Sequence, residues 1–169
     1  MRRAEQFLRA VRNSRELHRG WASPPNDRRR FTQYVSGLRK ENREGFFVVT
    51  ESGDIAGVIN VSEIVRGGFQ SAYLGYYALE PLAGHGLLRQ GLAAVITHSF
   101  GEFGLHRLEA NIQPENARSI ALVQSLGFRL EGLSPRYLKV CGRWRDHERW
   151  AVLSDNWRRR DARGRERKP

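Results

Sequence analysis

Tyr73-Leu-Gly-Tyr-Tyr-Ala-Leu79 opens the stretch that decides the fold, which continues through Glu80-Pro-Leu-Ala-Gly-His-Gly86 to Leu87-Leu-Arg-Gln-Gly-Leu-Ala-Ala-Val-Ile96. The first part is an aromatic and aliphatic run of strand length, and the second is a turn that contains two glycines. The third part has apolar residues at a spacing of four, namely Leu88, Leu92, Ile96 and Phe100. This order predicts a strand, a glycine turn and a helix from Gly86 to Phe103.

The glycine turn has the features of an anion site. A helix that begins at Gly86 has unpaired backbone N–H groups and the positive end of its dipole there. Gly84 and Gly86 carry no side chain, so an anion can approach the main chain closely. The turn is therefore predicted to cradle a phosphate or pyrophosphate, and the alternative is a turn that uses glycine for geometry alone. It lacks the Lys-Ser/Thr of a P-loop and the glycine spacing of a Rossmann turn, so ATP and NAD are not the expected ligands.

A second strand and helix are predicted after this helix. His106-Arg-Leu-Glu-Ala-Asn-Ile-Gln-Pro114 is strand-like, and Glu115-Asn-Ala-Arg-Ser119 opens an apolar helix that stops at Gly127. Asn116 fits the N-cap of that helix, with Ser119 at the third helical position. A strand, a helix and a second strand in this order place the two strands parallel in one sheet.

These blocks resemble the GNAT family of acyl-CoA-dependent N-acetyltransferases, and most closely its RimJ/RimL branch. The resemblance spans roughly residues 46–157 and rests on Val65-Arg-Gly-Gly-Phe69, Tyr73-Leu-Gly-Tyr76, Gly84-His-Gly86, Pro114-Glu-Asn-Ala-Arg-Ser119, Leu126-Gly-Phe128, Glu131-Gly132 and Gly142-Arg-Trp-Arg-Asp-His147. It implies an α/β (α+β) fold over residues 1–157, with a mixed central sheet, splayed parallel strands and flanking helices. It also implies acetyl-CoA as the cosubstrate, without a metal.

The resemblance assigns residues to both halves of the reaction. The implied cofactor-binding residues are Tyr77, Ala78, Gly84, His85, Gly86, Leu87, Leu88, Arg89, Asn116 and Ser119. Ser119 is the implied proton donor to the leaving thiolate, and Tyr137 is a polar candidate near the substrate end. The chain departs from the general family pattern at Ala83, where Gln or Arg is usual, at Leu88, where Gly or Ala is usual, and at Val123, where many members carry a tyrosine acid.

The sequence leaves the general base open. Glu80 and Asp146 are candidates, whereas relatives of this branch do not carry an acid at Glu109. Asp146 lies on the same face of its predicted strand as Trp144 and Trp150, because alternate residues of a strand point the same way. This predicts either a solvated edge or an inward carboxylate that orders the substrate. An N-terminal amine has a pKa of about 7.7 to 8.0 and lysine about 10.4, so deprotonating lysine costs roughly 3 kcal/mol more at neutral pH. A site without a strong base therefore suits an α-amine.

Three functions follow as hypotheses. The first is acetylation of the N-terminal alanine or serine amine of a protein such as a ribosomal protein, with Trp21, Tyr34 and Tyr137 on the peptide side. The second is acetylation of a small amine such as a polyamine, which the basic excess disfavours. The third is a non-catalytic module that binds acyl-CoA or RNA. The sequence does not set the oligomeric state, and a dimer is compatible with it.

Charge and composition limit the class of protein and its location. The chain has 169 residues and a formal net charge of +11, of which about +5 lies in Arg158–Lys168, with seven basic and two acidic residues. The segment 158–169 is predicted to be a disordered tail that either aids solubility or attracts RNA. Cys141 is the single cysteine, the five histidines lack metal-ligand spacing, and no signal peptide or apolar span is visible. These features predict a cytosolic protein that does not enter membranes.

The N-terminal region is predicted to be helical. Residues 3–19 form an amphipathic pattern, and Asp27 is placed to cap a second helix that carries Phe31 and Leu38. Members of the RimJ/RimL branch usually have a strand before these helices. The resemblance therefore implies that the first strand is missing here, or that the given start is internal.

Overall fold

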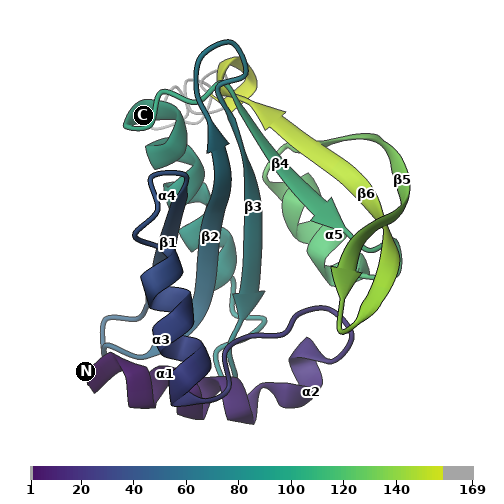
Figure 1. The fold of residues 1–169 in the computed structure, drawn as a ribbon. Coiled ribbons are helices and arrows are strands. Elements are labelled where there is room, and N and C mark those ends of the chain that lie inside the picture. Colours follow the sequence, from purple (N-terminus) through teal and green to yellow (C-terminus); the bar gives the residue numbers. More distant parts are fainter. Residues whose placement is uncertain (1, 158–169) are drawn as a thin grey trace, which may run out of the picture.

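A mixed β-sheet runs through the molecule, with helices on both faces and across one end (Figure 1). The computed structural model describes residues 2–157. Its elements are α1 (Arg2–Asn13), α2 (Arg15–His18), α3 (Arg28–Gly37), β1 (Arg43–Val49), β2 (Ile55–Val65), β3 (Ser71–Ala78), α4 (Leu87–Gly101), β4 (Arg107–Ile112), α5 (Ala117–Ser125), β5 (Arg129–Val140) and β6 (Arg143–Leu153). The strand order is β1-β2-β3-β4-β6-β5. This arrangement confirms the predicted α/β fold with a mixed sheet.

The parallel pair β3 and β4 separates part-way along its length. The two strands pair from Ser71 and Arg107 to Tyr73 and Glu109, and the pairing ends there although both strands continue. Beyond that point β3 stays paired with β2, and β4 stays paired with β6. The sheet therefore opens between β3 and β4, as Figure 1 shows, and the predicted splay is confirmed.

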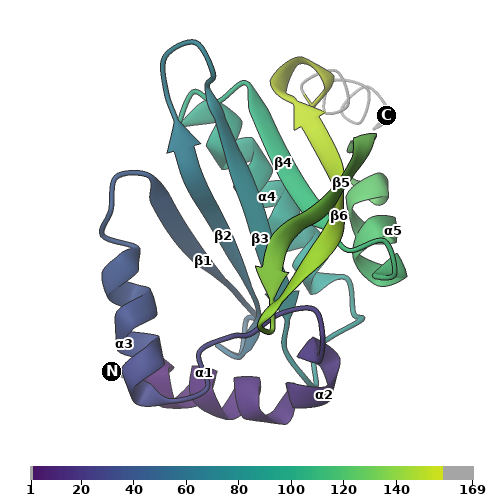
Figure 2. The same ribbon diagram turned by 45° about the vertical axis from the view of Figure 1, so that its right-hand side comes forward.

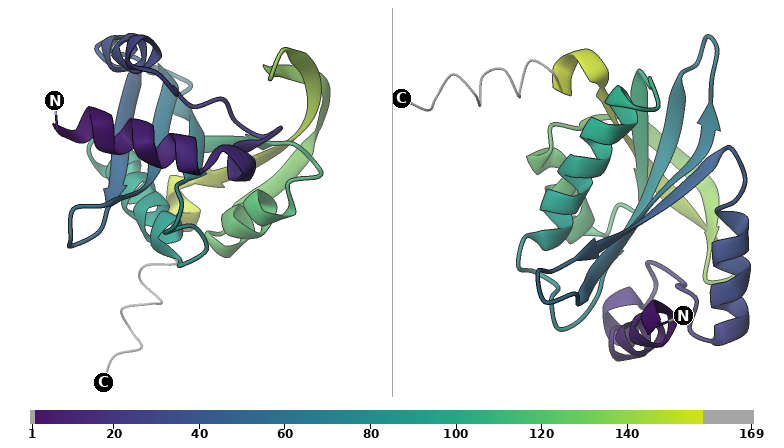
Figure 3. Two further views of the ribbon diagram at one scale, coloured as in Figure 1. Left: turned by 90° about the horizontal axis from the view of Figure 1, so that it is seen from below. Right: turned by 90° about the vertical axis from the view of Figure 1, so that its left-hand side faces the viewer.

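Two apolar cores lie on opposite faces of the sheet. Helices α4 and α5 cover one face and α3 lies on the other, with α1 across the lower end (Figure 3). Ile59 and Val61 of β2 belong to the core under α4, whereas Val58 packs with Phe7 of α1 in the second core. Alternate residues of a strand point to opposite faces, so one apolar strand serves both cores.

The predicted helix over residues 3–19 is interrupted at Ser14. The Ser14 hydroxyl donates to the Ala10 carbonyl oxygen at 2.7 Å and accepts from the Glu80 backbone N–H at 2.8 Å. A serine hydroxyl that bonds to local backbone competes with the helical ladder, so the chain continues as the separate short helix α2. Asp27 caps α3 as predicted, because its carboxylate accepts from the Arg30 N–H.

The last two strands form a hairpin that curls toward the lower end of the molecule (Figure 2). At its tip the Cys141 sulfur lies 3.3 Å from the Ser23 hydroxyl, which belongs to the segment between α2 and α3. The hairpin tip and this segment therefore meet below the gap between β3 and β4. Strand β3 begins at Ser71, two residues before the predicted run from Tyr73, and Phe69 is exposed.

Two predictions concern the ends of the domain. No strand precedes α1 within residues 2–157, and β1 is an edge strand of the sheet there. The basic segment predicted at 158–169 lies outside the described residues.

Candidate active site

The turn between β3 and α4 leaves backbone open at the start of a helix. Gly84 and Gly86 have φ values of 84° and 78°, and a Cβ built on either residue would meet nothing within 4 Å. Gly86 is the N-cap of α4 and makes no side-chain capping hydrogen bond. The first N–H groups of α4, from Leu87 onward, are therefore without a side-chain cap at an open surface, which fits the predicted pyrophosphate cradle.

The side chains of the predicted cradle have other partners. The exposed His85 ring places Nδ1 3.0 Å from the Ala83 carbonyl oxygen within the turn. Leu88 packs against the core under α4. The Arg89 guanidinium donates to the Ser125 hydroxyl at 3.1 Å and so ties α4 to α5. The side chains of His85, Leu88 and Arg89 are thus engaged within the protein. Binding of a pyrophosphate by the backbone of this turn, in spite of the departures at Ala83 and Leu88, stays a prediction.

The open end of β3 is held by a histidine from α2. His18 Nε2 lies 2.7 Å from the Ala78 carbonyl oxygen, and its ring meets the Tyr77 ring edge-on at 5.2 Å. Burial lowers the pKa of His18, although the bond to Ala78 opposes this shift. A neutral imidazole therefore donates its Nε2 proton to Ala78. Tyr77 and Ala78 belong to β3 beyond the point where it leaves β4, and the Ala78 carbonyl already has one partner. Their binding to the cofactor stays a prediction.

Ser119 is placed at the start of α5 by two separate hydrogen bonds. Its backbone N–H donates to Oδ1 of Asn116 at 3.2 Å, which confirms Asn116 as the N-cap. Its hydroxyl lies 2.7 Å from the Tyr76 hydroxyl of β3, so the side chain bridges the helix and the splayed strand. Burial raises the pKa of Tyr76 to about 12, which keeps this phenol protonated at neutral pH.

A second pair of tyrosines lies on the opposite face of the sheet. Tyr73 is the last residue of β3 that pairs with β4, and its side chain hydrogen-bonds to Tyr137 of β5. This bond and partial burial raise the pKa of Tyr73. The Tyr137 ring also lies 6.3 Å from the buried His147 ring. The curled hairpin thus brings Tyr137 to the point where the strands separate.

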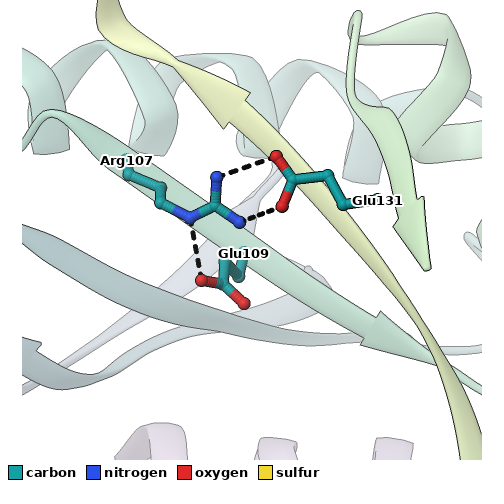
Figure 4. A network of polar contacts seen from close by, with 3 residues as sticks. All are labelled: Arg107, Glu109 and Glu131. Carbon is teal, nitrogen blue, oxygen red and sulfur yellow. Dashed lines mark hydrogen bonds and ion pairs between the residues drawn. The ribbon is translucent and has the colours of Figure 1, made fainter. Parts of the chain in front are cut away.

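An ion-pair network occupies the β4 side of that point. Arg107 Nε donates to Glu109 at 2.8 Å, and its two terminal nitrogens bind both carboxylate oxygens of Glu131, as Figure 4 shows. The pKa of Arg107 is raised and that of Glu131 is lowered, chiefly by the hydrogen bonds that join these two side chains. Both carboxylates on this surface are therefore paired with one guanidinium, and the three side chains together keep a single negative charge.

Comparison with known proteins decides the family. The model of the family described as Acetyltransferase (GNAT) domain matches residues 2–129. The chain belongs to the GNAT acetyltransferase family. The resemblance stated from the sequence is confirmed.

Relatives place this GNAT chain within the family. It is 33% identical over 128 residues to the probable N-acetyltransferase YjcK of Bacillus subtilis, covering 75% of this chain and 71% of that protein. It is 40% identical over 104 residues to the ribosomal protein uS5-alanine N-acetyltransferase of Escherichia coli. That match covers 62% of this chain and 54% of the Escherichia coli protein, so it spans about half of the relative's length.

Solved structures agree with this placement. RimJ of Mycobacterium smegmatis in complex with CoA-disulfide has a TM-score of 0.85 and 29% identity, covering 97% of this chain and 86% of that chain. Spermidine N-acetyltransferase of Vibrio cholerae in complex with CoA and spermine has a TM-score of 0.78, covering 93% and 94% of the two chains. At 21% identity, the second likeness shows the fold alone. The GNAT chain is an N-acetyltransferase of the RimJ/RimL branch, with acetyl-CoA as cosubstrate.

Two of the predicted acceptor-side residues have structural roles in this GNAT domain. Asp146 is exposed, and Oδ1 accepts from the Arg136 backbone N–H at 2.7 Å, where β5 and β6 change register. Its exposure agrees with the predicted solvated edge and not with an inward carboxylate, and the carboxylate also stabilises a β-bulge in which Arg136 has a φ of 48°. Tyr34 packs in the core under α3 and donates to Asn60, so it does not line the opening.

The remaining candidates keep their positions near the site. Glu80 follows β3, donates its backbone N–H to Ser14 and influences His18 electrostatically. Trp21 is 38% exposed and follows α2, on the segment that meets the hairpin tip.

Sequence reasoning missed Tyr76, Tyr73 and His18 as site residues. The alternation of β3 signals that Tyr76 and Tyr73 face opposite sides of the sheet, but it does not reveal their partners. His18 stands in an amphipathic segment and has no local motif. Each of the three acquires its position from an element that lies far away in the sequence.

Within residues 2–157, no three His, Cys, Asp or Glu side chains gather in a way that could hold a metal ion. None of the helices described is long and apolar enough to cross a membrane.

Proposed function

We propose that this enzyme transfers the acetyl group of acetyl-CoA to the N-terminal α-amine of a protein, with ribosomal proteins as the favoured class of acceptor. The uS5-alanine N-acetyltransferase of Escherichia coli and RimJ of Mycobacterium smegmatis are the relatives that support this acceptor. The observation that carries the proposal is the pairing of carboxylates on the acceptor side. Glu109 and Glu131 both bind Arg107, and Asp146 binds a backbone N–H.

This pairing bears on which amine can react. A polyamine would need carboxylates free to bind its several cationic amines, and here it would compete with Arg107 for Glu109 and Glu131. An α-amine has an ordinary pKa of about 7.7 to 8.0, so a substantial fraction is neutral at physiological pH without a strong base. The site therefore favours a single α-amine over lysine or a polyamine.

The proton of the departing thiolate is assigned to Ser119. The amine nitrogen forms a bond to the acetyl carbon, the carbon–sulfur bond breaks, and the sulfur takes a proton from the Ser119 hydroxyl. Tyr76 holds that hydroxyl at 2.7 Å and remains protonated, so it can stabilise the serine oxygen by donating to it. The amine gives up one proton to solvent, and the serine oxygen takes one proton back from solvent, so the protons balance and Ser119 is regenerated.

Acceptor preference is tested by thiol release from acetyl-CoA with three acceptors. The first is a peptide with a free N-terminal alanine or serine, the second is the same peptide acetylated at its N-terminus and containing lysine, and the third is spermidine. We expect turnover with the free peptide and at most about a hundredth of that rate with the other two, because the lysine and polyamine amines are protonated. Turnover confined to spermidine or to the blocked peptide would refute the proposal.

A further inference from the structure

A basic groove lies at the lower end of the molecule, between α1 and α2 on one side and the segment that leads from α2 to α3 on the other. Its volume is about 870 Å³, and its lining includes Arg12, Arg15, Arg19, Arg30, His18 and Cys141. All four arginines are exposed. Seen from below, α1 and α2 lie between this segment and the start of α4 (Figure 3). The groove and the cofactor cradle are thus on opposite sides of α1 and α2.

The charges of the groove are only partly balanced by the protein itself. Arg19 pairs with Glu16 at 3.5 Å, and Arg30 pairs with Asp27 at 3.7 Å. Arg12 and Arg15 have no ion-pair partner among residues 2–157. Two guanidinium groups therefore face the groove with their charge uncompensated, which favours an anionic occupant.

Two contacts connect the groove to the reaction site. His18 lines the groove and bonds to the carbonyl oxygen of Ala78, at the open end of β3. Cys141, at the hairpin tip, lines the groove and meets Ser23. The hairpin strand that ends at this tip also carries Tyr137, which reaches Tyr73 where the strands separate. A chain that leaves the reaction site on the acceptor side can therefore enter the groove past His18.

We infer that this groove binds the acceptor polypeptide beyond its first residue and favours acidic side chains there. This inference rests on the proposed function. Arg15 precedes His18 by three residues within α2, about 4.5 Å along the helix axis, and Arg12 lies beyond the break at Ser14, in the last turn of α1. An extended peptide advances about 3.3 Å per residue, so a chain that runs from His18 past Arg15 toward Arg12 meets the two arginines within its first few residues, which we take as acceptor positions two to four.

An acidic peptide fits the groove better than RNA does. Among the residues that the structure describes, no Phe, Tyr or Trp lines it. Proteins that bind single-stranded nucleic acid combine a positive groove with aromatic side chains on which the bases stack. A carboxylate needs only the guanidinium groups, which bind it through paired N–H donors.

The test compares peptides that begin with a free alanine and carry Glu, Gln or Lys at positions two to four. Exposed ion pairs contribute about 1.4- to 5-fold each, so two of them predict a preference of about 2- to 30-fold in kcat/KM for Glu over Gln. We expect this preference to lie in KM and to shrink between 50 mM and 500 mM NaCl, because exposed charges are screened. The Lys peptide should be the poorest acceptor.

The variant with Arg12→Gln and Arg15→Gln should turn over the Glu and Gln peptides almost equally. Arg9→Gln is the matched control, because Arg9 is an exposed arginine of α1 that does not line the groove, and it should keep the full preference. Both variants should retain the thermal shift produced by acetyl-CoA, which shows that the fold and the cradle are intact.

The outcomes separate the two proposals. Turnover without a charge preference, or a preference that persists in the double variant, would overturn the groove inference and leave α-amine acetylation standing. If a short single-stranded RNA binds the wild type but not the double variant, and turnover shows no preference among the Glu, Gln and Lys peptides, the groove binds RNA and not the acceptor. No turnover of any free-alanine peptide would remove the proposed function and this inference with it.

Discussion

The hydrogen bond between Tyr76 and Ser119 leads to a quantitative prediction about the proton donor. Tyr76→Phe removes the hydroxyl group that bonds to Ser119 and keeps the ring that packs against the core under α4. Ser119→Ala removes the proposed donor itself. If Tyr76 acts only through Ser119, the two substitutions must not be independent in their effect on kcat.

The magnitudes follow from the geometry of the pair. A positioned acid contributes about 10²-fold or more, so Ser119→Ala should lower kcat by about 10², or about 2.7 kcal/mol. A typical hydrogen bond contributes about 0.5 to 1.5 kcal/mol net, so Tyr76→Phe should lower kcat by about 2- to 10-fold. The double variant should be no slower than Ser119→Ala, because the Tyr76 contribution vanishes once the serine is gone.

Stability and cofactor affinity serve as the internal controls. Ser119→Ala leaves the partly buried Tyr76 hydroxyl without its partner and should cost about 1 kcal/mol or more in the free energy of unfolding. Replacing both partners should recover part of that loss. The affinity for acetyl-CoA should change little in all three variants, since the cradle depends on the backbone around Gly86.

The assay is thiol release from acetyl-CoA at saturating free-alanine peptide, beside urea unfolding of each variant. If the decrease in kcat of the double variant equals the product of the two single decreases, Tyr76 and Ser119 act independently. An unchanged kcat in Ser119→Ala, with only the loss of stability, would show that this serine has a structural role.

Three further substitutions test other parts of the site. Acetyl-CoA at 100 times its Kd should raise the Tm of the wild type by about 5 to 10 °C, and Gly86→Ala should abolish most of this rise. Gly104→Ala is the control, because Gly104 also has a positive φ of 62° and open space around it, so the variant carries similar backbone strain and should keep the rise. Asn116→Ala should cost about 1 kcal/mol of stability in urea unfolding and also raise the KM for acetyl-CoA, because the loss of the cap frees the Ser119 N–H; unchanged stability would contradict its capping role. Burial lowers the pKa of His18 below its ordinary value of 6.5 in the folded state, so the unfolded state takes up a proton first as the pH falls. The free energy of unfolding should therefore decrease as the pH drops below about 6.5, and His18→Gln should reduce this decrease. Equal profiles of the free energy of unfolding against pH in the two proteins would contradict the buried neutral imidazole.

Local signals account for what the sequence predicted correctly. Gly84 and Gly86, together with the apolar spacing that follows them, define the turn and α4 without reference to distant residues. Asn116 and Ser119 lie three residues apart, so their backbone bond is also a local feature. The parallel pairing of β3 with β4 follows from the intervening helix.

The features that were missed depend on tertiary contacts. Tyr76 and Ser119 are 43 residues apart, and their bond exists because the fold brings the start of α5 to β3. Ser14 ends α1 while its hydroxyl accepts from Glu80, 66 residues away. The role of Asp146 depends on a register change between β5 and β6, which alternation along one strand cannot reveal. Periodicity assigns a face to each residue, and the partner on that face comes from the fold.

The acceptor proposed for this enzyme is an α-amine, and one peptide can test this directly. The peptide carries a free N-terminal alanine, three glutamates and an internal lysine, and it is incubated with the enzyme and acetyl-CoA. Tandem mass spectrometry then locates the acetyl group on the fragments. We expect acetyl on the N-terminal fragment ions and none on the lysine at early times, and acetyl found on the lysine alone would contradict the account.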